Sequence, residues 1–149
     1  MKILLATDGS SGSDAAIRQI TSRPWPEGTV VKVLSVVELF TTKTPENFWV
    51  PESYYLKLEQ SLQEQARNAV EKAESQLRQD APALQIETDI VSGIAKEAII
   101  DEAENWGADI IVLGSHGYKG LKKLWYGSVS HAVAAHAGCT VEIVRSAHA

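Results

Sequence analysis

Short apolar segments alternate with amphipathic segments along this chain, and this alternation constrains the fold more than any other feature. Four of these segments are rich in valine, isoleucine and leucine and have the length of buried strands. Residues 84–91 instead alternate apolar with polar side chains, which predicts a half-exposed strand. We predict strands over residues 2–7, 30–37, 84–91, 109–113 and 140–144. Strands that alternate with helices are typical of a mostly parallel sheet that is covered on both faces.

The segments between these strands have helical periodicity. Apolar residues recur at spacings of three and four over residues 57–78, which predicts a long helix with a charged outer face. We expect the third helix to end at Gly107 and the fourth, which starts at Ser128, to end at Gly138, because glycine commonly terminates helices. The first helix follows Asp8 and has serine hydroxyls available for its N-cap.

Length and composition favour a single domain. With 149 residues and 44% hydrophobic content, the chain can bury one sizeable core and is too short for two ordinary domains. We therefore expect one domain over residues 1–149, with an α/β fold. The predicted architecture is a five-stranded, mostly parallel open sheet of order 3-2-1-4-5 with helices on both faces, which is Rossmann-like.

Charge and cysteine content exclude several classes of function. The net charge of −5 argues against nucleic-acid and membrane-surface partners, which require clustered lysine and arginine. No apolar run approaches the roughly 20 residues that span a bilayer. Cys139 is the single cysteine, so an intrachain disulfide is excluded, and the first residues have no signal-peptide pattern. We expect a cytoplasmic protein whose partners are small molecules or proteins.

Two loops stand out at the predicted reversal of strand order, between the first and fourth strands. Ligands of open α/β sheets bind there, beyond the carboxyl ends of the strands. One loop begins at Asp8. The other reads Gly114-Ser115-His116-Gly117 and, nine residues later, Gly127-Ser128-Val129-Ser130 at a helix start. Glycines let backbone N–H groups approach phosphate oxygens, and a helix start attracts anions.

Simpler explanations exist for several of these residues. Asp8 could cap the first helix, and the glycines could be ordinary turns. Three loop lysines could form a solvated face, and we leave them out of the site: Lys119, Lys122 and Lys123. The aromatics Trp49, Tyr54 and Tyr55 could form a lid over a base. We favour the alternative that they pin residues 38–55 to the domain body.

The chain resembles the universal stress proteins, in the branch that binds ATP. The resemblance extends from the opening KILLATDGS through VSGIAKEAI and GADIIVLGSHG to GLKKLWYGSVS and the closing CTVEIVR. The spacing Gly-x2-Gly-x9-Gly-Ser matches the nucleotide-binding signature of that family without a gap. The resemblance to the family is weakest over residues 38–55.

The resemblance implies a set of nucleotide-binding residues. It assigns the turn after the first strand to base and ribose, the end of the second strand to adenine, and the glycine motif to the phosphates. The Asp8 carboxylate suits ribose hydroxyls. The residues implied are Ala6, Thr7, Asp8, Val36, Leu113, Gly114, His116, Gly117, Gly127, Ser128, Val129 and Ser130.

These residues predict an ATP-binding regulatory protein, a nucleotide-dependent switch with slow or no hydrolysis. No catalytic residue and no metal site made of protein ligands is predicted. ADP or AMP could replace ATP, and Mg²⁺ or Mn²⁺ is expected on the phosphates. The alternatives are an ATPase or nucleotide α-hydrolase, and a dimeric module that binds no nucleotide. A homodimer through residues 140–144 is expected, since an uncovered apolar edge strand tends to be paired; the resemblance implies the same.

Overall fold

Strands and helices alternate throughout the computed structural model, which describes residues 1–38, 51–115 and 127–146. The elements, in chain order, are β1 (Lys2–Ala6), α1 (Ser11–Thr21), β2 (Val30–Val37), α2 (Glu52–Asp80), β3 (Gln85–Ser92), α3 (Ala95–Trp106), β4 (Ile110–Gly114), α4 (Ser128–His136) and β5 (Thr140–Val144). Every predicted strand is present, and each strand boundary lies within one residue of its expected position.

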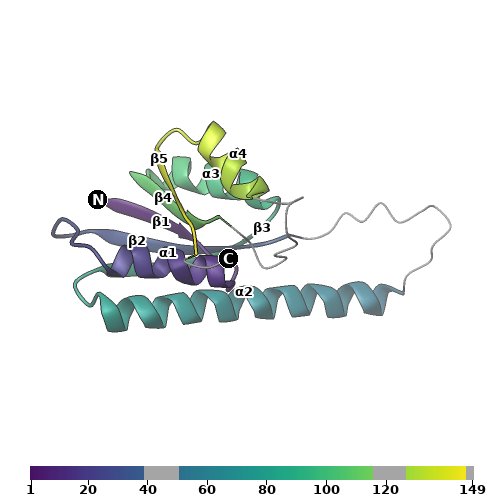
Figure 1. Ribbon diagram of the computed structural model, residues 1–149. Helices are drawn as coiled ribbons and strands as arrows, with labels where there is room; N and C mark the ends of the chain where they lie inside the picture. The colour runs from purple at the N-terminus through teal and green to yellow at the C-terminus, as the bar shows by residue number, and fades with distance from the viewer. Residues whose placement is uncertain (39–50, 116–126, 147–149) are drawn as a thin grey trace.

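The five strands form one sheet in the order β3-β2-β1-β4-β5, and every neighbouring pair is parallel (Figure 1). Leu4 of β1 pairs with Lys32 of β2 on one side and with Ile111 of β4 on the other. The predicted fold class and strand order are therefore confirmed. The order reverses between β1 and β4, so the carboxyl ends of these two strands lie next to each other.

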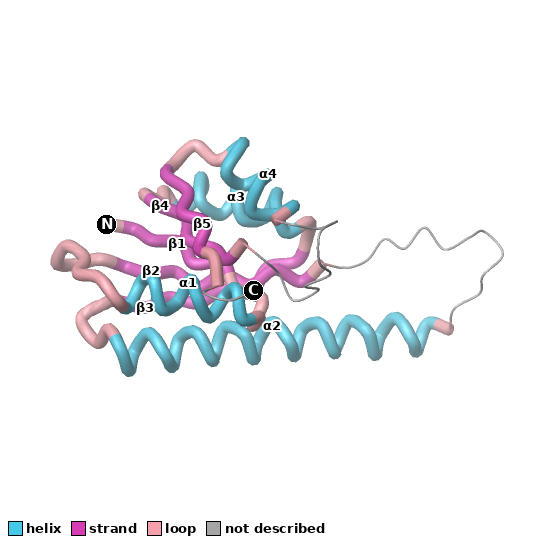
Figure 2. The backbone as a smooth tube through the Cα atoms, in the orientation of Figure 1, coloured by secondary structure: helices cyan, strands magenta, loops and turns pink. Residues whose placement is uncertain are grey.

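Two helices cover each face of the sheet. Figure 2 shows α1 and α2 on one side and α3 and α4 on the other. Consecutive residues of β1 illustrate how the layers form: Leu5 packs with Ile17 and Leu77 against α1 and α2, whereas Leu4 packs with Ile99 against α3. The alternation of side chains along a strand thus supplies a buried apolar row to both faces, as a parallel sheet requires.

Helix α2 begins earlier than the apolar periodicity predicts, at Glu52, and its first part extends beyond the sheet (Figure 1). Its buried residues all lie in the part that covers the sheet: Ala66, Ala69, Val70, Ala73 and Leu77. Tyr54 and Tyr55 are 58% and 42% exposed. The expectation that these two tyrosines pin the chain to the domain body is wrong, because the helix carries them past the sheet. Trp49 lies outside the described residues.

Of the two glycines predicted to end helices, one does so. Gly107 ends α3 with a φ of +77°, and its N–H donates to the carbonyls of Ala103 and Glu104. The prediction for Gly138 is wrong. Helix α4 ends at His136, and Ala137 already has extended backbone at the start of a three-residue connection to β5.

Candidate nucleotide-binding site

The neighbouring carboxyl ends of β1 and β4 each lead into a loop followed by a helix. The first loop joins β1 to α1 and contains Asp8; the second leaves β4 at Ser115, and α4 begins after Gly127. Ligands of doubly wound sheets bind at such a reversal of strand order. The structure thus places the starts of α1 and α4 at the same edge of the sheet.

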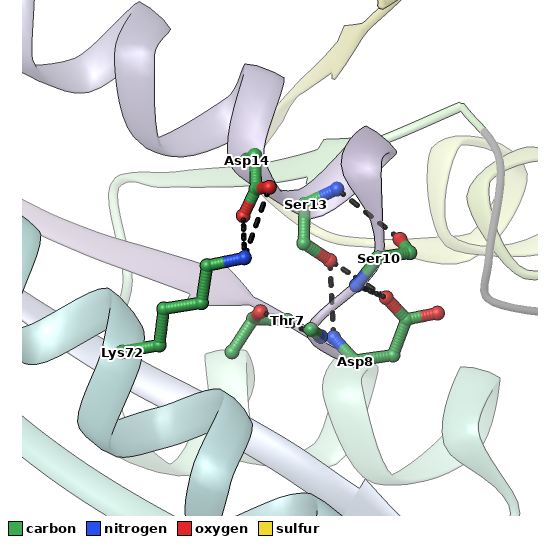
Figure 3. Close-up of polar contacts among 7 residues, drawn as sticks. Thr7, Asp8, Ser10, Ser13, Asp14 and Lys72 are labelled. Atoms are coloured by element: carbon green, nitrogen blue, oxygen red, sulfur yellow. Dashed lines mark hydrogen bonds and ion pairs between the residues drawn. The ribbon is translucent and has the colours of Figure 1, made fainter.

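A compact hydrogen-bonded turn holds Asp8 (Figure 3). Its Oδ1 accepts hydrogen bonds from the Ser10 N–H at 2.9 Å and from the Ser13 hydroxyl at 2.8 Å. The Asp8 N–H donates in turn to the Ser13 Oγ at 3.0 Å. Ser10 is the N-cap of α1, since its side chain accepts from the Ser13 N–H at 3.3 Å. Asp8 itself precedes the cap, and its side chain is at the surface.

Thr7 and Gly9 fix the backbone of this turn. The Thr7 N–H donates to the Leu34 carbonyl at 2.9 Å, which extends the pairing of β1 with β2, and the Thr7 hydroxyl accepts from the Gly9 N–H at 3.2 Å. Gly9 has a φ of +81°, and a Cβ there would lie 3.3 Å from the Cβ of Ala69 on α2. A side chain would therefore meet both backbone strain and a crowded neighbour.

Ala6 and Val36 are half-buried at the ends of β1 and β2 and pack against the core under α3 and α4. They lie on the face of the sheet that α4 covers. Leu113, also on this face, is buried at the end of β4. Ala6 and Val36 therefore provide apolar surface beside the Asp8 turn, whereas Leu113 belongs to the core beneath it.

Gly114 has a packing role that its sequence motif does not reveal. A Cβ at Gly114 would lie 2.5 Å from the backbone carbonyl carbon and oxygen of Gly12, in the first turn of α1. Real Cβ atoms do not approach that closely, so only glycine fits here without a backbone shift. The close contact of these two glycines brings the end of β4 against the start of α1.

Ser115 is a polar residue of this loop that the sequence-based site omits. It is buried, and its N–H donates to the Val144 carbonyl at 2.9 Å, which continues the pairing of β4 with β5. Its hydroxyl is inaccessible to solvent and has no hydrogen-bond partner within the part of the chain that the structure describes. Unsatisfied buried hydroxyls are uncommon in proteins, and a ligand is one way to satisfy them. The position of Ser115 inside the glycine motif was the sequence signal that could have placed it in the site.

The start of α4 has the features of an anion site. Gly127 is its N-cap, with a φ of +69° and no side-chain capping bond, and the first turn contains no acidic residue. The Gly127 carbonyl accepts from the Ser130 hydroxyl at 3.0 Å and from the His131 N–H at 2.6 Å. A Cβ on Gly127 would lie 2.6 Å from the Ser130 Oγ. Exposed Ser128 and half-buried Val129 complete the first turn, whose N–H groups carry the positive end of the helix dipole.

The structure thus brings the described members of the two predicted loops to one edge of the sheet. An added Cβ at Gly127 would also lie 3.3 Å from the Ser115 carbonyl, which shows that the start of α4 sits directly on the end of β4. His116 and Gly117 of the motif lie outside the described residues, as do the three loop lysines. Two further residues contribute to this edge through contacts that only the structure reveals. Gly12 packs against Gly114, and Ser13 bonds to Asp8.

Within residues 1–38, 51–115 and 127–146, no group of three or more histidine, cysteine, aspartate or glutamate side chains could hold a metal ion. In the same ranges, no helix combines the length and apolarity that crossing a membrane requires. Burial, with a smaller contribution from the negative charge of Asp109, raises the pKa of Cys139, so its thiol is protonated at neutral pH.

The fold and these two loops define a doubly wound α/β protein with a candidate ligand site at the edge of the sheet where the strand order reverses. The chain belongs to the universal stress protein family, whose model matches residues 1–145. Universal stress protein YxiE from Bacillus subtilis is 30% identical over 148 residues, which cover 97% of this chain and 98% of that protein.

Universal stress protein MJ0577 from Methanocaldococcus jannaschii is 29% identical over 154 residues, which cover 97% of this chain and 94% of that protein. A solved structure of MJ0577 matches this one with a TM-score of 0.83 and covers 99% of this chain and 97% of its own. More distant structures of the same fold contain nucleotides. One is a universal stress protein in complex with cAMP, at 22% identity and a TM-score of 0.69, covering 99% and 98% of the two chains.

Proposed function

We propose that this protein binds an adenine nucleotide, with ATP as the principal ligand, and acts as a nucleotide-dependent regulatory switch. The main support for nucleotide binding is the structure of the start of α4. It combines a glycine N-cap of positive φ, a first turn without acidic residues and a position directly on the end of β4. Besides the cAMP complex, a family member from Arabidopsis thaliana has AMP bound and one from Archaeoglobus fulgidus has dAMP bound, which supports the adenine class.

The chemistry of the edge assigns the parts of the nucleotide. The backbone N–H groups of Ser128, Val129 and Ser130, with the exposed hydroxyl of Ser128, favour the phosphates, because the positive end of the α4 dipole lies there. The Asp8 carboxylate favours neutral hydroxyl donors, which the ribose supplies. The half-buried apolar side chains of Ala6 and Val36 provide a surface for the base. His116 and Gly117, with Thr7, Leu113 and Gly114, complete the proposed set.

The described residues of this edge support slow hydrolysis, or none. Efficient hydrolysis needs an oriented general base near the attacking water. Asp8 accepts hydrogen bonds from Ser10 and Ser13 through Oδ1 and precedes a helix start that carries a further acid, Asp14.

A Mg²⁺ or Mn²⁺ ion would be held chiefly by the phosphates and water, and it would offset phosphate charge.

We also propose a homodimer through β5. This strand is an edge of the sheet, and one of its apolar side chains, Ile143, is exposed. Among the described strands, β5 pairs with β4 alone, so pairing with a second copy would satisfy its outer edge and cover this side chain. The Ile143→Lys variant should be monomeric in sedimentation equilibrium while the native protein is dimeric. A native protein that sediments as a monomer would contradict the dimer and leave nucleotide binding untouched.

Calorimetric titration with ATP, ADP, AMP and GTP in the presence of Mg²⁺ tests nucleotide binding. The decisive variant is Gly127→Ala, because an added Cβ would collide with Ser130 and force strain at the phosphate end. Gly107→Ala is the matched control. An alanine at its φ of +77° would have similar backbone strain, about 1–2 kcal/mol. No atom lies within 4 Å of its Cβ position, and the residue lies at the end of α3, outside the proposed site.

Micromolar affinity for ATP in the native protein and in Gly107→Ala, with a loss of at least about tenfold in Gly127→Ala, is the expected result. Equal losses in the two glycine variants would show that instability, and not the site, sets the affinity. Absence of ATP binding by the native protein would refute the proposal and favour the dimeric module. Release of ADP or AMP at a steady rate would instead favour the ATPase or nucleotide α-hydrolase.

A further inference from the structure

The contact of Ser13 with Asp8 is reciprocal, and this sets it apart from the other contacts of the turn. The Ser13 hydroxyl donates to the Asp8 Oδ1 at 2.8 Å while its oxygen accepts from the Asp8 N–H at 3.0 Å. Figure 3 shows the hydroxyl of Ser13 directed at the Asp8 carboxylate from the first turn of α1. One side chain therefore fixes both the backbone and the carboxylate of Asp8.

The burial of the two side chains differs in a way that suits a support and a supported group. Ser13 is 5% exposed, whereas the side chain of Asp8 is at the surface. A surface carboxylate normally samples several rotamers, and ordering it has an entropic cost. Two hydrogen bonds to Oδ1, from the Ser10 N–H and the Ser13 hydroxyl, remove most of that freedom before any ligand arrives.

We propose that Ser13 is a positioning residue of the nucleotide site, which holds the Asp8 carboxylate ready for the ribose hydroxyls. This inference rests on the proposed function. A role in capping α1 does not explain the contact, because Ser10 is the N-cap and the Asp8 N–H lies before the helix. Bonds to an ionised group are stronger than those between neutral groups, so the hydroxyl of Ser13 has a large influence on the carboxylate.

The test compares ATP with 2′,3′-dideoxy-ATP, which lacks both ribose hydroxyls, by calorimetry on the full chain. Native protein should prefer ATP by about tenfold, since a hydrogen bond to a charged group is lost with the analogue. Ser13→Ala should bind ATP about tenfold more weakly and the analogue with unchanged affinity. The preference would then disappear. Ser13→Cys, which fills similar space with a weak hydrogen-bonding group, should give the same result if the alanine variant does not fold.

Ser10→Ala is the matched control. It makes the same chemical change in the same turn and removes the cap, yet the Ser10 N–H that contacts Asp8 is part of the backbone. Its preference for ATP over the analogue should stay native even where its thermal stability falls. In the Asp8→Ala background, Ser13→Ala should cause no further loss of ATP affinity, because the positioned group is already absent.

Several outcomes would overturn the inference. Equal weakening of both nucleotides by Ser13→Ala would mean a purely structural role, and so would the same loss of preference in Ser10→Ala. Unchanged ATP affinity in Ser13→Ala would mean that Asp8 needs no support. Native protein that binds both nucleotides equally would refute the ribose contact and leave nucleotide binding intact. Native protein that binds neither would refute the proposed function as well.

Discussion

The starts of α1 and α4 lie at the same edge of the sheet but are completed in opposite ways. At α1, Ser10 caps the helix, Asp8 bonds to the first turn, and Asp14 adds a second negative charge that pairs with Lys72. At α4, the cap is a glycine without a side-chain bond, and the first turn contains no acid.

This difference gives the proposed site a direction. A phosphate near α1 would meet the negative charge of Asp8 and a helix start that Ser10 already caps, whereas at α4 it would meet backbone N–H groups and the positive end of a helix. Neutral hydroxyl donors have the reverse preference, because a carboxylate accepts from them. A nucleotide would therefore lie with its ribose at α1 and its phosphates at α4.

The largest expected effect comes from moving the end of β4, on which the start of α4 sits, away from the start of α1. Gly114→Ala would place a Cβ 2.5 Å from the Gly12 backbone, so the end of β4 and the start of α1 must move apart. We expect a loss of about 3 kcal/mol or more in the free energy of unfolding, measured by chemical denaturation. Gly138→Ala is the control, since no atom lies within 4 Å of its Cβ position. A mild effect at Gly114 would mean that the two starts adjust independently.

A negative charge placed at each start in turn would sharpen the comparison. Ser128→Asp and Ser11→Asp both substitute an exposed residue at the first position of a helix. The first should stabilise α4 by about 0.5 kcal/mol and weaken ATP binding by at least about tenfold through repulsion of the phosphates. The second should weaken ATP binding less than about threefold. Calorimetry and thermal unfolding measure the two effects, and equal losses of affinity would contradict the proposed direction.

The smallest effect is expected from the ion pair that supports α1. Lys72 Nζ lies 3.0 Å from the Asp14 Oδ2, and the lysine side chain is 51% exposed. Lys72→Met should lower the free energy of unfolding by no more than about 0.5 kcal/mol, with ATP affinity unchanged. Unfolding at low and high salt checks the assignment, since screening should remove the difference. A large loss of ATP affinity would show that Lys72 belongs to the site.

Much of the fold could be predicted because its signals are local. Four strands are runs of mostly apolar residues, β3 mixes apolar and polar residues, and Gly107 ends its helix as its type suggests. The failures also have local causes. Periodicity of apolar residues marks only the part of α2 that is buried, so the exposed turns that carry Tyr54 and Tyr55 escaped prediction. At Gly138, the requirement for extended backbone into β5 took effect one residue earlier.

The sequence alone selected the two loops of the candidate site, because the alternation of strands and helices implies a switch point and the glycine spacing marks the loop beside it. Only the tertiary structure decided that Gly114 faces Gly12 and that the end of β4 supports the start of α4. It also decided that Ser13 reaches back to Asp8. Periodicity and turn chemistry act between near neighbours in the chain, whereas these contacts depend on how helices and strands pack and on where each side chain points once they have done so.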